Sequence, residues 1–280
     1  ASDVYKRQAE NSLRSLGLKH SSVVFEELYA TNNPELTCIE VLDERYHTNR
    51  FSFENNNIDE GVTFSTICNA TAYQPQLKEE LIEAVNAWVM GDFLTYGNIS
   101  DWDVSLITDM SSLFSGLPNF NDNISNWDVS NVTNMSSMFD QAYSFNQDLS
   151  EWNVSNVTSF AHTFAGCSQF TSDLSAWQVN NVINMTGMFK FCSSFESDLS
   201  SWDIRNVTST HRMFHKASNF NSDLSNWDVG NVTDMVAMFY DAKQFSGNLS
   251  NWNVSNVINM SEMFLNLSLI HISEPTRPLT

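Results

Sequence analysis

Acidic and amide side chains recur at one position of a 25-residue repeat, where carboxylates could bind a cation. Side chains at the same position of neighbouring parallel strands lie about 4.8 Å apart. Two carboxylates at that distance repel each other by about 1 kcal/mol in water and by several-fold more at a partly buried site. A divalent cation would relieve this repulsion, and calcium prefers oxygen ligands. Asp103 with Asp128 and Asp203 with Asp228 are therefore candidate calcium ligands. The alternative is that water and splayed side chains suffice, because calcium sites usually gather more ligands than two carboxylates supply. We expect no other cofactor.

The same position is the best candidate for partner binding, because repeat proteins commonly bind along such extended faces. Two residues further along each repeat, the side chain varies more than the core does, and Ser130, Ser155 and Arg205 belong to this set. A merely solvated face is the alternative. The candidate binding residues at the recurring position are Asp103, Asp128, Asn153, Gln178, Asp203, Asp228 and Asn253.

Catalytic constellations are not visible in the sequence. It shows no Ser/His/Asp or Cys/His arrangement, phosphate loop or recurring metal-ligand cluster. His211 and His215 are spaced i, i+4, which on a helix can hold a metal, although a solvated pair is the simpler interpretation. We therefore expect a protein that is not an enzyme.

The charge balance excludes two classes of partner. The chain has a formal net charge of −20, and residues 101–264 hold 17 acidic and five basic residues. Nucleic acids and anionic membrane surfaces require Lys and Arg, so neither is expected as a partner. No apolar run approaches the roughly 20 residues of a transmembrane helix.

A fixed 25-residue period indicates a repeat array. Within one unit, Trp127 and Val129 alternate with polar residues, as in a short strand with one buried face. Apolar residues then follow at steps of three and four after a residue of the helix-capping type, which predicts a short helix. We therefore predict an α/β repeat, a solenoid with one short parallel strand and one short helix per 25 residues. Seven units are marked by Trp102, Trp127, Trp152, Trp177, Trp202, Trp227 and Trp252.

Further columns of side chains run along this array. Each Trp shares its parity with a Val or Ile two residues on, so we predict core tryptophans rather than a sugar-stacking surface. The asparagines at 131, 156, 181, 206, 231 and 256 would satisfy backbone groups at the bend, although some also fit the N-glycosylation pattern. Cys167 and Cys192 lie one repeat apart at a small core position, and we expect free buried thiols, because neighbouring helix axes would hold them too far apart for a disulfide.

The segment Asn-Trp-Asp-Val-Ser-Asn-Val-Thr-Asn-Met-Ser-Ser-Met-Phe (126–139), with Phe-Asn-Gln-Asp-Leu-Ser (145–150), closely resembles the repeat of the BspA-like leucine-rich-repeat surface proteins. The resemblance covers about residues 76–264. It implies that the predicted α/β repeat is a leucine-rich-repeat-like solenoid, and that the chain is an exported or cell-surface bacterial protein with a role in adhesion or protein binding. Leu106, Phe160, Thr163 and Thr210 depart from the pattern at single positions.

The array occupies part of the chain. We expect seven repeats over 101–266, the last one truncated, preceded by a helical N-terminal cap over 71–100 whose helix spans 76–90. Residues 9–70 resemble the end of an upstream leucine-rich-repeat segment, in which Cys38 and Cys68 could form a bridge. Residues 1–8 and 267–280 resemble translated sequencing-adapter read-through and are left out of the fold prediction.

These observations favour an extracellular or cell-surface module that binds a protein, an extracellular matrix or a host surface through its polar strand face. A structural stalk or spacer within a larger surface protein is one alternative. A glycan-binding module that uses exposed aromatic side chains is the other.

Overall fold

The computed structural model describes residues 15–17, 38–40, 63–65, 72–92 and 95–267. The chain divides into two compact units: residues 1–73 with 90–102, and residues 74–89 with 103–280. The segments 1–8 and 268–280, together with Cys68, lie outside the described residues, and the Cys38 side chain is not described. The predicted bridge between these two cysteines therefore stays a prediction.

The first unit contains three short parallel strands, β1 (Ser15–Gly17), β2 (Cys38–Glu40) and β3 (Thr63–Ser65), in the order β1-β2-β3. Its described residues also include the short 3-10 helix η2 (Ile99–Asp101), where the Asn98 side chain accepts the Ser100 N–H. The rings of Tyr73, Tyr96 and Trp102 cluster, with centroids 4.7 to 6.3 Å apart.

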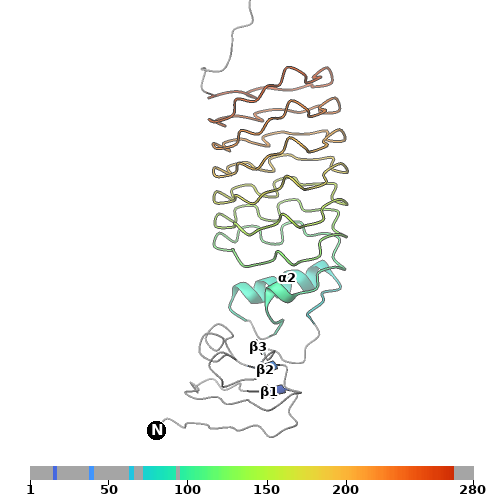
Figure 1. Ribbon diagram of the computed structural model, residues 1–280, viewed down its shortest axis with the longest axis vertical. Coiled ribbons are helices and arrows are strands. Elements are labelled where there is room, and N and C mark those ends of the chain that lie inside the picture. Colours follow the sequence, from blue (N-terminus) through green and yellow to red (C-terminus); the bar gives the residue numbers. More distant parts are fainter. Residues whose placement is uncertain (1–14, 18–37, 41–62, 66–71, 93–94, 268–280) are drawn as a thin grey trace, which may run out of the picture. The chain divides into compact units, whose positions relative to one another are not determined.

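The second unit begins with the helix α2 (Lys78–Val89), within the segment for which a helix was predicted. Its buried face holds Leu81, Ala84, Val85 and Trp88. The Trp88 indole donates to Asp122 at 2.9 Å, and the Lys78 ammonium lies 3.1 Å from Asp109. The helix therefore covers the first coil of the repeats (Figure 1). No helix in the described part of the chain is long and apolar enough to span a bilayer.

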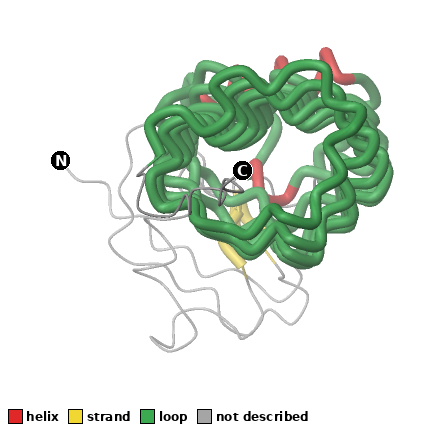
Figure 2. The backbone as a smooth tube through the Cα atoms, turned by 90° about the horizontal axis from the view of Figure 1, so that it is seen from above, coloured by secondary structure: helices red, strands yellow, loops and turns green. Residues whose placement is uncertain are grey.

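The repeats, residues 103–267, form a stack of coils that we call the array, with one coil per 25 residues. Seen along the stack, the coils superimpose on one closed outline (Figure 2). The described coils contain no helix, and their parallel pairing is limited to one residue per coil, from Asp109↔Asn134 to Asp234↔Asn259. The prediction of an α/β, leucine-rich-repeat-like solenoid with a strand and a helix in each repeat is therefore wrong.

The backbone conformation explains why no helix forms. Two positions of each coil have positive φ, first at Ser112 (61°) and Gly116 (72°). A helix needs φ near −63° at every residue, so these two positions interrupt it. Eleven of the fourteen residues at these positions are not glycine, and a left-handed conformation costs each of them about 1–2 kcal/mol. The later members are Ser137, Gln141, His162, Gly166, Gly187, Phe191, Arg212, Lys216, Ala237, Asp241, Glu262 and Asn266.

Hydrogen bonds between coils replace those of a helix. Phe139 donates its N–H to the Thr163 carbonyl of the next coil at 2.8 Å, and Gln141 donates to Ala165 at 2.7 Å. The residue between them, Asp140, instead closes a turn within its own coil by donating to Ser137 at 3.1 Å. These turns also bring side chains inward at steps of three and four, which is why the sequence looked helical.

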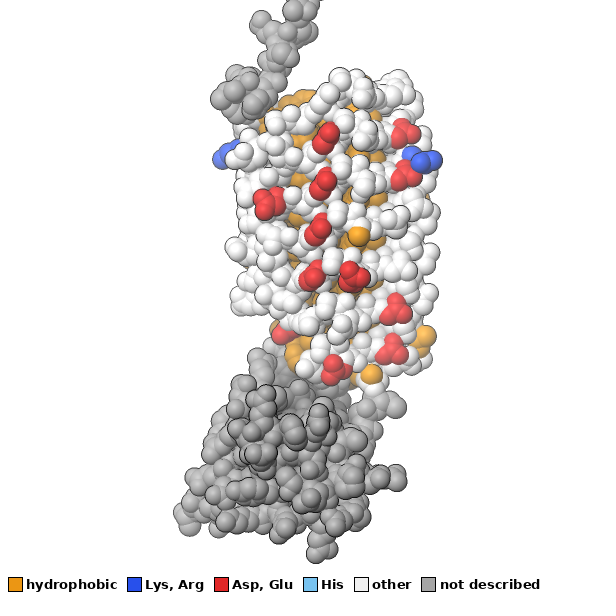
Figure 3. Space-filling view, in the orientation of Figure 1, with side chains coloured by type: hydrophobic (Ala, Val, Ile, Leu, Met, Phe, Trp, Pro, Cys, Tyr) orange, Lys and Arg blue, Asp and Glu red, His pale blue; other side chains and the backbone are white. Residues whose placement is uncertain are grey.

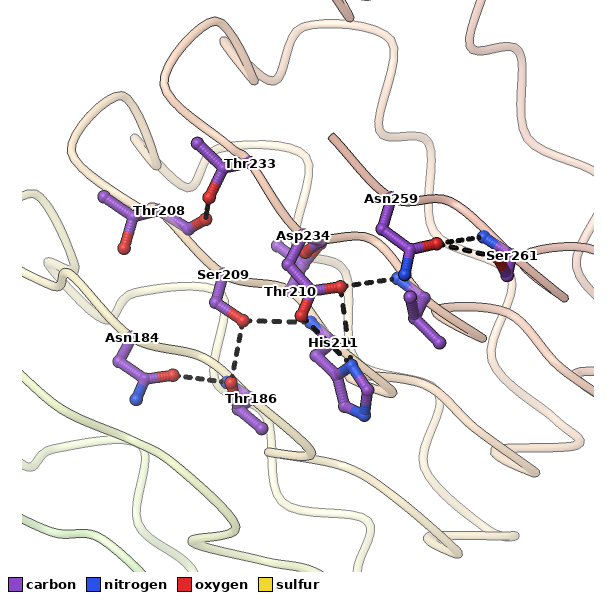
Figure 4. Close-up of polar contacts among 11 residues, drawn as sticks. Asn184, Thr186, Thr208, Ser209, Thr210, His211, Thr233, Asp234, Asn259 and Ser261 are labelled. Carbon is purple, nitrogen blue, oxygen red and sulfur yellow. Dashed lines mark hydrogen bonds and ion pairs between the residues drawn. The ribbon is translucent and has the colours of Figure 1, made fainter. Parts of the chain in front are cut away.

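The residues predicted to cap the helices perform a related task. Asn184 accepts the backbone N–H of Thr186 at 2.9 Å, and Asn259 accepts that of Ser261 at 3.0 Å (Figure 4). Such Asx turns fix the direction of the backbone locally without starting a helix. Ser209 belongs to the same column, and its hydroxyl lies 2.8 Å from that of Thr186.

The segment predicted as a strand is also a turn. Trp127 and Val129 are buried and Asp128 is exposed, as the alternation requires. However, Asp128 accepts the N–H of Ser130 at 3.0 Å, and Val132 donates to the Val129 carbonyl at 2.9 Å. Hydrogen bonds within a single bend therefore replace the inter-strand hydrogen bonds that a β-sheet would form.

Aromatic side chains fill the interior of the array. Trp127 to Trp227 are buried and Trp252 is half-buried in the array, and Trp102 of the first unit is buried as well, so the prediction of core tryptophans is confirmed. The Trp177 indole donates to the Leu149 carbonyl of the preceding coil at 2.9 Å. Phe139 stacks on Phe145 of its own coil, with ring centroids 4.0 Å apart, and on Phe164 of the next coil at 5.5 Å.

Two further sequence predictions are confirmed. Cys167 and Cys192 are free and buried, and burial raises the pKa of each thiol. Each asparagine of the predicted column donates its side-chain amide to a carbonyl of the preceding coil at 2.7–2.8 Å, as Asn181 does to Ser155. This shared role explains the recurrence of asparagine without glycosylation.

Replacing one of these asparagines should measurably destabilise the array. Asn181→Ala removes the bond to the Ser155 carbonyl and should lower the free energy of unfolding by about 1 kcal/mol, as measured by denaturant unfolding. Asn180→Ala is the control, because the adjacent Asn180 side chain is exposed and makes no hydrogen bond within the described residues. Equal losses in the two variants would contradict a specific role for the asparagine column.

Candidate functional site

The partner-binding residues predicted from sequence lie on successive coils at the surface turn that follows each Trp. Asp103 and Asp203 are half-buried and the other five residues of the recurring position are exposed, as is Arg205, whereas Ser130 and Ser155 are half-buried. Six of the seven recurring side chains accept the N–H two residues on, as Asn153 does from Ser155, and the exception, Gln178, donates to the Ala176 carbonyl. Turn formation thus accounts for the choice of Asp and Asn. The predicted binding role stays a prediction.

The carboxylates at this position already have partners. Hydrogen bonds from Ser105 hold the pKa of Asp103 below its usual range. A hydrogen bond from Arg205, 2.9 Å from the carboxylate, does the same for Asp203. Among the described residues, no group of three or more His, Cys, Asp or Glu side chains is placed to hold a metal ion.

Calcium binding at Asp103/Asp128 or Asp203/Asp228 remains testable. A cation that binds only the folded chain must raise the melting temperature, and Asp128→Asn with Asp228→Asn should abolish that rise. The measurement is thermal unfolding with and without calcium. An unchanged melting temperature in the parent chain would show that solvated carboxylates and turn bonds suffice.

A second acidic column was missed in the sequence. Asp148, Asp173, Asp198 and Asp223 are exposed, and each accepts the N–H of the serine two residues on at 2.9 Å. These backbone bonds hold the pKa of each carboxyl below its usual range, although neighbouring carboxylates act in the opposite direction at Asp148, Asp173 and Asp223. Acidic side chains consequently follow one another along the stack (Figure 3).

A cavity of about 600 Å³ opens on another part of the surface, along the segment that carries the left-handed residues. We call it the turn-face cavity. Tyr143 and Phe191 lie at its wall with 49% and 41% of their surfaces exposed, which is unusual for aromatic side chains in an array that buries its tryptophans. The lining residues come from three successive coils: Ser137, Asp140, Gln141, Tyr143, His162, Ala165, Gly166, Ser168, Lys190 and Phe191.

Two glycines make room for the side chains of this cavity. A Cβ at Gly187 would lie 2.5 Å from Nδ1 of His162, and one at Gly166 would lie 3.3 Å from the Tyr143 ring. Both glycines have positive φ, which glycine adopts without steric cost. The left-handed columns therefore set the wall of the cavity as well as the course of the backbone.

Cationic side chains gather beside the cavity. The Lys190 and Lys216 ammonium groups lie over the Phe191 ring, 5.0 and 5.4 Å from its centroid, within the range of cation–π attraction. Arg212 is exposed on the same coil as Lys216. We call Lys190, Arg212 and Lys216 the basic cluster. None of the three forms an ion pair with another described residue.

The pKa values of two histidines reflect the positive charge of this region. Burial, together with the positive charges of Arg212 and Lys190, lowers the pKa of His215 to about 4. Burial also lowers the pKa of His162, although the carboxylate of Asp140 opposes the shift. The His215 ring stacks on Tyr240 with centroids 4.6 Å apart, and within the described structure its buried Nδ1 has no hydrogen-bond partner.

His211 and His215 do not form the metal pair that an i, i+4 spacing on a helix would allow. Residues 211–215 form turns rather than a helix, and His211 lies 3.2 Å from Asp234 of the next coil (Figure 4). His215 is half-buried among aromatic rings rather than solvated, so the two imidazoles have separate environments.

The comparison with protein families matches residues 85–202 and 175–273 to the family described as "Mycoplasma protein of unknown function, DUF285". The match covers more than half of the chain. The chain belongs to this family. A comparison with curated proteins found no match. The family matches span the coils on which the turn-face cavity and the basic cluster lie.

Sequence reasoning missed the turn-face cavity because it assigned this segment to a helix. The sequence did contain one signal for this site, because the residue type at two equivalent positions varies from repeat to repeat. The columns that begin with Ser115 and Gly116 hold Lys190, Phe191, His215 and Lys216 in later repeats, whereas the column that begins with Trp102 keeps one residue type. Gly166 and Gly187 within the expected helices were a second signal, because glycine is unfavourable there.

Acid should destabilise the fold through His215. Its pKa is about 4 in the folded chain against an ordinary value of 6.5, so the unfolded chain binds more protons between these values. Above about pH 6.5 the imidazole is neutral in the folded and the unfolded chain, so it does not lower the free energy of unfolding. That free energy falls as the pH decreases towards 4. His215→Gln should make the melting temperature less dependent on pH in this window.

His211→Gln is the matched control, because it removes an imidazole that has a carboxylate partner, Asp234. It should not weaken the pH dependence. An undiminished slope in His215→Gln would show that the buried imidazole is not the group responsible.

Proposed function

We propose that the array is a non-catalytic binding module of an exported or cell-surface protein. It engages a partner protein through the surface that carries the left-handed residues and the turn-face cavity, which we call the turn face. The observation that carries the proposal is the turn-face cavity with its two exposed rings. Large aromatic side chains supply much of the binding energy in protein interfaces, and Tyr and Arg are enriched among the residues that matter most. Tyr143, Phe191 and Arg212 are such residues on a rigid scaffold.

The export and surface location in this proposal come from the resemblance to BspA-like surface proteins. That resemblance concerns the repeat motif, and the adhesion role it implies is compatible with an array that varies at its surface. The structure favours a different face for binding than the sequence did. The Asp and Asn side chains at the position of Asp128 form turns, whereas the residues of the turn face vary from coil to coil.

Glycan binding is the second candidate, because aromatic rings are exposed after all. The tryptophans that we first considered for stacking are buried, but Tyr143 and Phe191 lie beside Gln141 and Ser168, whose side chains could bond hydroxyl groups. A stalk or spacer needs only the stack itself, and it predicts no selective ligand at any face.

Binding of the labelled chain to immobilised extracellular proteins and oligosaccharides separates these functions. We expect saturable binding to a protein, which Tyr143→Ser with Phe191→Ser should weaken at least about tenfold, because each ring contributes on the order of 1 kcal/mol or more. Asp128→Asn with Asp228→Asn is the matched control on the other face and should leave binding unchanged.

Each other outcome favours a named alternative. Selective binding to oligosaccharides would favour the glycan module. Loss of binding only in the Asp variants would return the function to the face predicted from sequence. Binding to nothing would leave the spacer. Melting temperatures of all variants establish that each one is folded.

A further inference from the structure

The basic cluster is anomalous in a strongly acidic chain. Residues 101–264 hold only five basic residues, and three of them, Lys190, Arg212 and Lys216, belong to the cluster. The other two already have carboxylate partners: Arg205 lies 2.9 Å from Asp203, and Lys243 lies 3.9 Å from Asp241. The cations without an ion-pair partner among the described residues are therefore concentrated at one place on the array.

The arrangement around Phe191 holds two like charges together. Lys190 and Lys216 come from adjacent coils, and both ammonium groups lie within 5.4 Å of one ring centroid. Attraction to the ring offsets part of their mutual repulsion, and an anion between them would remove the rest. The pair is thus preorganised for a carboxylate or another oxyanion.

Opposing carboxylates near the cluster are few. Asp140 lines the cavity, and Asp241 lies close enough to act on His215 but is engaged with Lys243. Elsewhere the array is acidic, notably along the column of Asp148 and Asp173. An acidic partner would be repelled by that surface and attracted only to the cluster, which orients it on approach.

The cavity next to the cluster favours a peptide over a sugar. Lys190 and Lys216 occupy the face of the Phe191 ring, and the Tyr143 ring lies against the backbone position of Gly166. A pyranose needs an open ring face for stacking, whereas an apolar side chain can enter between ring edges. Gln141 and Ser168 also line the wall, where the Gln141 amide can donate to or accept from peptide groups and the Ser168 hydroxyl, which donates to the Tyr143 carbonyl at 3.3 Å, can still accept.

We infer that the turn-face cavity and the basic cluster together bind an acidic segment of a partner polypeptide, with carboxylates at Lys190 and Lys216 and an apolar side chain in the cavity. This inference rests on the proposed protein-binding function and specifies the chemistry of the partner.

The test uses the full chain and a fluorescent Glu/Asp-rich peptide that carries one Phe, with binding followed by polarisation. We expect saturable binding that weakens several-fold from low to high salt, because exposed charges are screened. Lys190→Glu with Lys216→Glu should weaken it at least about tenfold. Arg205→Glu with Lys243→Glu makes the same change in net charge at partnered cations and should alter binding less than about twofold.

A second variant and two further probes complete the design. Phe191→Leu keeps both lysines but removes the ring that holds them, and should also weaken binding. A Gln/Asn analogue of the peptide should bind at least about tenfold more weakly than the acidic form. A sulfated oligosaccharide should compete poorly.

Several outcomes would overturn the inference. Equal losses in the two Glu pairs would show general electrostatics rather than a site. Tighter binding of the oligosaccharide would assign the cluster to anionic glycans, and a concentration-dependent dimer lost in Lys190→Glu with Lys216→Glu would assign it to a second copy of the chain. If the acidic peptide fails while a neutral or basic protein still binds through Tyr143 and Phe191, this inference falls and the proposed function stands.

Discussion

Hydrogen bonds between adjacent coils are the interaction on which the rest of the array depends. Alternate N–H groups, such as those of Phe139 and Gln141, leave their own coil for a carbonyl of the next, and the residues between them close turns. This division requires a left-handed residue at two positions of every coil. Because neither partner is a side chain, the bonds place no demand on residue type at the surface.

Interior and surface therefore follow different rules. Inside, Phe139 and Phe164 stack in register, and the indoles from Trp152 to Trp252 each donate to a carbonyl of the coil before them, so residue type repeats. On the turn face, the equivalents of Asp140 and Gln141 become Lys190 and Phe191 in a later coil without any change in the backbone bonds. A scaffold of this kind can change the chemistry of one patch while its fold stays constant.

The sequence predicted burial better than it predicted conformation. The alternation at Trp127 and Val129 identified buried residues correctly. So did the apolar spacing of three and four that follows it, because the residues it marks, such as Met135, Met138 and Phe139, are buried. The same spacing arises from successive turns, so it could not distinguish them from a helix. Intervals of three and four residues indicate which side chains point inward. The direction of each backbone N–H depends on φ instead, and a residue type such as that of Gln141 does not indicate a positive φ.

The candidate site was harder to foresee for a related reason. Its residues belong to different repeats, and only the registered stacking of coils brings His162 against Gly187 or Lys216 over Phe191. Once the helix is replaced by turns, these neighbours follow from the 25-residue period. The asparagine column was predictable because a single residue type recurred at a bend where carbonyls needed donors.

The left-handed residues also bear on how the array unfolds. A lone coil would carry their steric cost, on the order of 2–4 kcal/mol for two non-glycine residues, without the neighbour that supplies the compensating bonds. The intrinsic free energy of one coil is thus unfavourable and the coupling between neighbours favourable, as in a one-dimensional lattice with strong nearest-neighbour terms. Such a lattice melts in long blocks. A ligand held across the coils of Tyr143, Phe191 and Lys216 would join several lattice units and so strengthen the cooperativity of the whole stack.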